Sequence, residues 1–189
     1  MKLQKEQRKQ MHLKNKLLAV ILLLVVCFSL SSCGGNMTDE LARAELERLL
    51  PTSYELNEIF WGKGLPTVEN TSTDRYKTVK DESGYESVDE ILRKASTVFS
   101  ADYLKSIEDA IFIGNEEVYP RYKEINGVLK ADTQNEGFNI KGNIVIETAK
   151  IKKQNRAMMI VEADYEDGGT AELSLILQNG RWYLNSPTY

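Results

Sequence analysis

A cysteine that follows an apolar run and two small residues is the part of this sequence that most directly indicates chemistry. Leu30-Ser31-Ser32-Cys33 closes an apolar run, Leu17 to Leu30, behind a basic leader. A basic region, an apolar region and small residues at a cleavage site form the layout of a secretory signal. The peptidase needs small side chains beside the cut, and the thiol must lie at the membrane surface to receive a diacylglyceryl group. The pattern therefore predicts a bacterial lipobox, with residues 1–32 as signal peptide and Cys33 as the lipidated residue.

An uncleaved membrane anchor is the alternative for this segment. The run from Leu17 to Leu30 has fourteen residues, whereas a spanning helix needs about 20. Two acyl chains give lasting attachment, because each buried methylene contributes about 0.8 kcal/mol. We therefore expect a protein anchored by lipid to the extracytoplasmic face of the cell membrane. The single lysine-rich leader and Gly34 fit a Gram-positive plasma membrane.

Cleavage before Cys33 would remove most of the groups that commonly catalyse reactions. Cys27 and His12, the one histidine, both precede the cut, and Cys33 is used for lipid. No disulfide, catalytic triad or histidine-ligated zinc can then be built. The leader holds six of the 24 basic and one of the 28 acidic side chains, so the remaining 157 residues carry a formal charge of −9. We expect no enzyme, no cofactor, no metal site and no nucleic-acid partner.

Acidic side chains are plentiful, and three groups of them could in principle do chemistry: Glu116-Glu117, Asp81-Glu82, and the set Glu162, Asp164, Glu166 and Asp167. Paired carboxylates about 5 to 10 Å apart can hydrolyse glycosides. No spacing singles out such a pair, and adjacent acids on a strand point in different directions. Asp164 to Gly169 also lacks the spacing of a calcium-binding EF-hand loop. Solvated surface and a hairpin turn are the favoured interpretations.

Three aromatic segments could line a binding surface. Phe60-Trp61 precedes Gly62, Tyr119-Pro120-Arg121-Tyr122 precedes a run of strands, and Trp182-Tyr183 follows a turn. Pro120 cannot donate to a ladder and marks a sheet edge or entry, and an exposed edge can pair with an extended peptide. Core packing is the favoured interpretation for Trp182, whereas the helix-end position of Trp61 gives that ring a better chance of lining a groove.

The elements that must position the acidic and aromatic candidates begin with an N-terminal set of helices. Thr38 can cap a first helix, and Pro51 either ends it or begins a second helix that stops at Gly62 with a left-handed cap. The polar passage from Thr67 to Gly84 holds one short edge strand, Arg75 to Lys80. Ser87 and Glu90 form a capping box for a helix to about Phe99, and Ser100 or Asp102 caps the next helix, which ends at Gly114.

From Tyr119 onward the apolar pattern has a period of two. Asn126-Gly127 predicts a type I′ hairpin between Tyr122–Ile125 and Val128–Ala131. Four further strands are expected over 138–151, 157–165, 170–178 and 182–185, and their short connections require antiparallel neighbours. The sequence thus predicts a single α+β domain over 38–189, behind a tether at 33–37. Its helices would lie on one face of a curved antiparallel sheet, either a cystatin-like or NTF2-like half-cone or a less regular sheet.

The order of these segments resembles a group of clostridial-type surface lipoproteins similar to the DL-endopeptidase inhibitor family of the IseA type. The resemblance covers about Tyr54 to Tyr189 and lies in Phe60 to Pro66, Gly84-Tyr85-Glu86-Ser87, Ile125 to Leu129 and Asn179 to Leu184. It implies a non-catalytic protein that blocks peptidoglycan endopeptidases by inserting a loop, for which Leu65-Pro66 is the candidate. The lipobox and the small number of prolines depart from the family pattern.

The sequence therefore predicts a lipid-anchored protein of the cell envelope that works by binding, with a cell-wall hydrolase or another envelope protein as partner. The alternative is an NTF2-like or cystatin-like module that binds a small ligand or acts as a sensor. An enzyme is the third possibility. The candidate binding residues are Trp61, Leu65, Pro66, Tyr85, Tyr119 and Tyr122.

Overall fold

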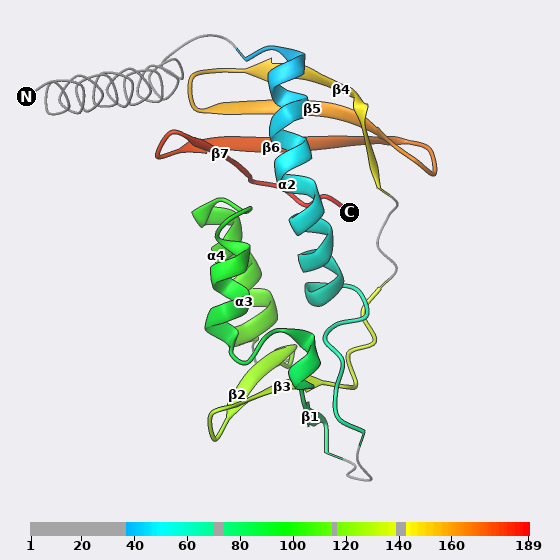
Figure 1. The fold of residues 1–189 in the computed structure, drawn as a ribbon, viewed down its shortest axis with the longest axis vertical. Coiled ribbons are helices and arrows are strands. Elements are labelled where there is room, and N and C mark those ends of the chain that lie inside the picture. Colours follow the sequence, from blue (N-terminus) through cyan, green and yellow to red (C-terminus); the bar gives the residue numbers. More distant parts are fainter. Residues whose placement is uncertain (1–36, 70–73, 115–116, 139–142) are drawn as a thin grey trace, which may run out of the picture. The chain divides into compact units, whose positions relative to one another are not determined.

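One long helix, α2 (Asp39–Phe60), is the element against which the other elements are arranged (Figure 1). The computed structural model describes residues 37–69, 74–114, 117–138 and 143–189, which belong to one compact unit, Asn36–Tyr189. The predicted signal peptide and Cys33 lie outside the described residues. Among the described helices, none combines the length and the apolar character that crossing a bilayer requires.

The helix α2 begins as predicted and continues further than predicted. Thr38 caps it by accepting a hydrogen bond from the Leu41 amide, 3.3 Å away. Pro51 lies inside the helix and is exposed, so it neither ends one helix nor begins another. A proline removes one backbone hydrogen bond, and burial of the apolar side chains on both sides outweighs that loss. These side chains are Ala42, Leu46, Leu49, Leu50, Leu56 and Ile59, whereas the expected core residues Leu41 and Ala44 are exposed.

A four-stranded antiparallel meander forms the larger sheet. Its order is β4-β5-β6-β7, with β4 at Ile144–Gln154, β5 at Met158–Tyr165, β6 at Thr170–Gln178 and β7 at Arg181–Leu184. The helix α2 contacts both edge strands, β4 and β7, and therefore crosses one face. Alternate residues such as Leu173 and Leu175 are buried on that face, as the period of two predicts. The strand expected from Phe138 begins only at Ile144.

A second, three-stranded sheet has the order β1-β3-β2, with β1 at Tyr76–Thr78, β2 at Tyr122–Ile125 and β3 at Val128–Asp132. Asn126 and Gly127 have φ angles of 54° and 73°, which confirms the type I′ turn. No described strand of this sheet pairs with the meander. The α+β class is confirmed, but the strands form two sheets where one curved sheet was expected.

Four short helical segments lie between β1 and β2: η1 (Asp81–Ser83), α3 (Val88–Ala95), α4 (Ala101–Glu108) and the π-helical η2 (Asp109–Ile113). Ser87 and Ser100 cap α3 and α4 as predicted. The Glu90 carboxylate binds the amide of Glu86, not that of Ser87. The predicted extension of α3 to Phe99 is wrong, because the residues after Ala95 turn and pair with β7 through the Val98 carbonyl and Ser100 amide.

Candidate functional site

A cleft of about 680 Å³ lies where α2 ends. Three segments that are distant in the sequence form its walls. They are the last residues of α2 with Trp61, the segment from η2 to Arg121, and the segment from Asp132 to Phe138, with Arg75 beside them. Ligand pockets typically have volumes of about 300–1,000 Å³. The size of this cleft is therefore sufficient for a small ligand or for a few side chains of a protein partner.

The carbonyl groups at the end of α2 bring these segments together. The last carbonyls of any helix lack partners within the helix. Here the Ile59 carbonyl accepts from the Tyr122 hydroxyl at 2.9 Å, the Trp61 carbonyl accepts from the Phe138 amide at 2.8 Å, and the Gly62 carbonyl accepts from the Arg121 guanidinium. Local amides of Trp61, Gly62 and Gly64 satisfy the preceding Asn57 and Glu58 carbonyls, so the distant residues act on the carbonyls that the local bonds leave open. Gly62 does not have the expected left-handed conformation, which occurs two residues later at Gly64, with φ 76°.

An aromatic cluster forms one wall of the cleft. The Trp61 ring lies 6.2 Å from the Phe138 ring and 6.0 Å from the Tyr189 ring, measured between centroids. Phe138 is 50% exposed, so part of this apolar surface faces solvent. The Trp61 indole nitrogen is buried and has no hydrogen-bond partner. Gly137 allows the close approach, because a Cβ there would lie 2.0 Å from the Gly62 carbonyl oxygen.

Charged side chains form the floor of the cleft. Arg75 donates two hydrogen bonds, of 3.0 and 2.8 Å, to one carboxylate oxygen of Asp132, whose side chain is fully buried. The Arg75 guanidinium also lies 3.8 Å from the centre of the Tyr119 ring, within the range of a cation–π contact. The Asp132 contact raises the pKa of Arg75 and keeps this guanidinium charged. The pair therefore fixes the orientation of the exposed Tyr119 ring.

Arg121 is 4% exposed and separates the cleft from a second hollow of about 250 Å³. Its guanidinium donates to the Gly62 carbonyl and, at 2.9 Å, to the side chain of Asn135. It makes no ion pair with a carboxylate of the described residues. Helix C-termini carry partial negative charge. The end of α2 therefore supplies the charge that stabilises this buried cation.

Tyr122 lies beneath the second hollow and is fully buried. Its hydroxyl donates to the Ile59 carbonyl and accepts from the Leu65 amide, both at 2.9 Å. Burial is the main reason that its pKa is raised above the usual range of a tyrosine. Tyr122 therefore holds the segment after α2 in place by two hydrogen bonds.

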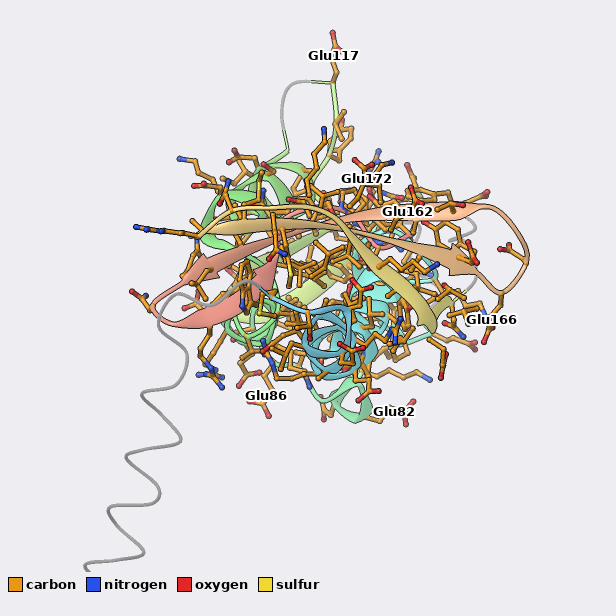
Figure 2. The ribbon with its side chains drawn as sticks, turned by 90° about the horizontal axis from the view of Figure 1, so that it is seen from above. Glu82, Glu86, Glu117, Glu162, Glu166 and Glu172 are labelled. Atoms are coloured by element: carbon orange, nitrogen blue, oxygen red, sulfur yellow. The ribbon has the colours of Figure 1, made fainter. Side chains whose placement is uncertain are left out.

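The rim of the cleft carries exposed apolar side chains and acids. Val118 is 51% exposed and Tyr119 is 54% exposed, and Ile113, at 60%, directly precedes the lining residue Gly114. Exposed contiguous apolar surface marks interaction sites. Three lining acids, Asp109, Glu117 and Glu136, are also exposed, and Glu117 projects outward in Figure 2. The surface therefore suits a ligand with apolar and positively charged groups.

The structure brings together only part of the predicted site. Trp61 and Tyr119 line the cleft, while Tyr122 and Leu65 line the second hollow and are buried. Pro66 is exposed, so it is the member of the Leu65-Pro66 pair whose side chain reaches solvent. Tyr85 does not line the cleft. Its hydroxyl donates a hydrogen bond to the Glu55 carboxylate at 2.7 Å, and burial raises the pKa of Tyr85.

Sequence reasoning missed several residues of this site: Arg75, Asp132, Asn135, Gly137 and Phe138. The largest difference from expectation concerns Phe138, which was expected in a strand and lies in the cleft. A usable signal was present in Gln134 to Gly137, since this polar, glycine-ending run indicates a loop. Arg121 stood inside the Tyr119 to Tyr122 segment, but its burial depends on α2 and could not be inferred from spacing.

The acidic groups outside the cleft lie on the surface. Figure 2 shows Glu82 and Glu86 on one side of the unit and Glu162 and Glu172 on another. Lys152 pairs with Glu162 at 2.9 Å and with Glu172 at 3.1 Å. Asp164 to Gly169 forms the predicted β5–β6 hairpin turn, and Trp182 is 8% exposed, as expected for a core residue. Across the described ranges, no group of three or more potential ligands could hold a metal ion.

Comparison with protein-family models and with curated proteins gave no match for this chain. The function of this chain is therefore inferred from its predicted lipobox, from the resemblance in segment order and from the geometry of the cleft.

Proposed function

We propose that this protein is a lipoprotein anchored at the extracytoplasmic face of the cell membrane that acts by binding, without catalysis, to a protein of the cell envelope. The cleft at the end of α2 is the observation that carries this proposal. Its exposed rings and aliphatic side chains lie on a well-ordered framework of buried hydrogen bonds, which is the arrangement of an interaction site. The lipobox supports the location, because Cys33 is the only thiol that remains after cleavage.

A cell-wall hydrolase of the DL-endopeptidase type is the partner to test first. The resemblance in segment order supports this choice. The position of the contact differs from the one that the resemblance implies, because Leu65 is buried whereas Tyr119 and Phe138 are half-exposed at the cleft. We therefore assign the contact to the cleft, with Pro66 as a peripheral residue.

The test is a hydrolysis assay on purified cell walls with the endopeptidases of the producing cell and the full-length lipoprotein in detergent. We expect the wild-type protein to slow the release of muropeptides. The Tyr119→Ala/Phe138→Ala variant should lose most of this effect, because both rings are removed from the rim. The Leu41→Ala/Val128→Ala variant is the matched control, since it removes two apolar side chains that are 52% and 42% exposed away from the cleft. Equal inhibition by both variants would refute the assignment to the cleft.

The volume of the cleft favours a second candidate, a module that binds a small extracytoplasmic ligand. Native mass spectrometry of the full-length protein would show a bound molecule as added mass. The chain has two tryptophans, so Trp182→Phe leaves Trp61 as the single reporter of the cleft. A ligand that shifts Trp61 emission, and that does so equally in the presence of wall hydrolases, would favour this candidate over the protein-binding one.

A further inference from the structure

A concentrated group of cations lies around the turn between β4 and β5. The seven residues from Lys150 to Arg156 include four basic side chains and no acid, although the sequence after Ser32 is strongly acidic. Lys150, Lys152, Lys153 and Arg156 are all exposed. Lys152 forms ion pairs with Glu162 and Glu172. Lys153 and Arg156 make no ion pair with any residue in the described part of the chain.

This turn is bound to the beginning of the described chain. The Met37 amide donates to the Gln154 side chain at 2.9 Å, and the Gln154 side chain donates to the Met37 carbonyl at 3.0 Å. Asp39 accepts from the Ile151 amide at 2.8 Å, and Asn155 accepts from the amides of Ala157 and Met158. Figure 1 shows the start of α2 beside the β4–β5 turn. The turn therefore has a fixed position relative to Met37.

The distance between Met37 and the lipidated cysteine is short. Cys33 precedes Met37 by four residues, and an extended chain spans at most about 3.6 Å per residue, or about 14 Å in all. If Cys33 carries lipid, as the proposed function requires, Met37 and the turn bound to it lie close to the bilayer. The Debye length is about 8 Å at physiological ionic strength, so the turn can reach the region in which lipid charge is felt.

The meander distributes charge unequally between the two ends of its sheet. The β6–β7 turn lies at the same end as the β4–β5 turn and adds the exposed Arg181, whereas the β5–β6 turn lies at the opposite end and carries Asp164, Glu166 and Asp167. Nearby acids at the basic end are Asp39, Glu40 and Asp102. The Asp39 carboxylate accepts a hydrogen bond from the Ile151 amide. All three acids lie in the first turn of a helix, where the helix dipole offsets their negative charge.

We propose that Lys153, Arg156 and Arg181, here called the basic end, bind the headgroups of anionic phospholipids. This contact orients the domain with the basic end on the membrane and the acidic β5–β6 turn away from it. The helix α2 begins near the basic end, crosses the strands of the meander and spans about 33 Å at 1.5 Å per residue. The cleft therefore lies one helix length from the point at which the chain is anchored.

The test measures orientation in the full lipidated protein on vesicles. In the lipidated protein Cys33 is acylated and Cys27 has been removed, so an introduced cysteine is the single free thiol. One variant, Ala157→Cys, places a fluorophore beside the basic end, and a second variant, Thr170→Cys, places it at the opposite end of the sheet. Energy transfer to an acceptor lipid reports the distance of each dye from the membrane. We expect stronger transfer from position 157 than from position 170 on vesicles of phosphatidylcholine with phosphatidylglycerol. The difference should shrink on pure phosphatidylcholine and at high salt.

Charge variants complete the test. Each cation near an anionic membrane contributes about fivefold, so Lys153→Gln/Arg156→Gln should lower the ratio of docked to undocked domains about 25-fold. Lys63→Gln/Arg93→Gln removes the same charge from exposed positions elsewhere and should leave the ratio unchanged. Equal transfer from positions 157 and 170, or equal behaviour on neutral and anionic vesicles, would overturn the inference. Failure of the lipid anchor is a different result, because every variant would then leave the vesicles and the N-terminal peptide would lack acyl mass.

Discussion

Replacement of Tyr122 by phenylalanine tests the idea that hydrogen bonds from a distant residue, added to the local cap, hold the end of α2 and the segment that follows it. The substitution keeps the ring and removes only the hydroxyl. The Ile59 carbonyl and the Leu65 amide, each 2.9 Å from that hydroxyl, then lose their partner in a site where Tyr122 is fully buried. A buried polar group without a partner costs about 1–3 kcal/mol. We expect the loss of both partners to lower the free energy of unfolding by about 2–6 kcal/mol.

Thermal and urea unfolding of the full-length protein in detergent, followed by circular dichroism, measures this change. In a chain of this size 1 kcal/mol shifts the melting temperature by about 2–4 °C, so Tyr122→Phe should melt about 4–24 °C lower. Tyr183→Phe is the matched control, because the Tyr183 hydroxyl makes no hydrogen bond to a described residue and its side chain is half-buried on β7. Equal melting temperatures for the two variants would refute the role of the hydroxyl.

Three further predictions concern the surroundings of the cleft. Gly137→Ala should lower the urea midpoint of unfolding more than Gly127→Ala does. Both glycines have positive φ angles, but only at Gly137 would an added Cβ meet the backbone, 2.0 Å from the Gly62 carbonyl oxygen. Thr188→Val should destabilise the protein by about 1–3 kcal/mol in the same assay, since Ser53 and Asn57 are buried and both bind the Thr188 hydroxyl; Thr97→Val, at an exposed position, is the control. Burial raises the pKa of Tyr103 above its value in the unfolded chain, so the stability that it contributes is complete below about pH 10 and is lost as the pH rises further. Titration of unfolding between pH 8 and 12 should show this decline, and Tyr103→Phe should reduce it.

Local rules predicted the elements of this fold well where the residues that decide an element are adjacent in sequence. Asn126-Gly127 fixes its turn because only a few residue types accept two positive φ angles. Ser87 and Ser100 cap helices through amides three residues away. The same rules failed at Pro51, where the local cost of a missing hydrogen bond is smaller than the gain from burying leucines on both sides. They failed again at Phe99, where pairing with β7 replaces a further turn of helix.

The candidate site was harder to predict because its groups are joined by contacts between distant segments. Trp61 and Tyr119 could be chosen for their aromatic rings, but nothing in their spacing showed that both would face one cleft. Asp132 directly follows the predicted hairpin strand Val128–Ala131, and its role as the partner of Arg75 depends on the pairing of β1 with β3. Phe138 has an apolar side chain that periodicity assigned to a strand. Its position depends on contacts with distant residues, namely the hydrogen bond from its amide to the Trp61 carbonyl and the ring contacts with Trp61 and Tyr189.

The end of α2 links stability to binding in this protein. Its Ile59 carbonyl accepts from Tyr122, and the Trp61 and Gly62 carbonyls just after it accept from Phe138 and Arg121. Phe138 and Arg121 also line the cleft. The local amides of Gly62 and Gly64 satisfy only the Asn57 and Glu58 carbonyls. Distant donors to the Ile59, Trp61 and Gly62 carbonyls therefore draw the segments of the cleft toward the end of α2. It follows that a substitution at Arg121 should weaken both folding and partner binding, whereas substitution of the exposed rings of Tyr119 and Phe138 should affect binding with little effect on stability.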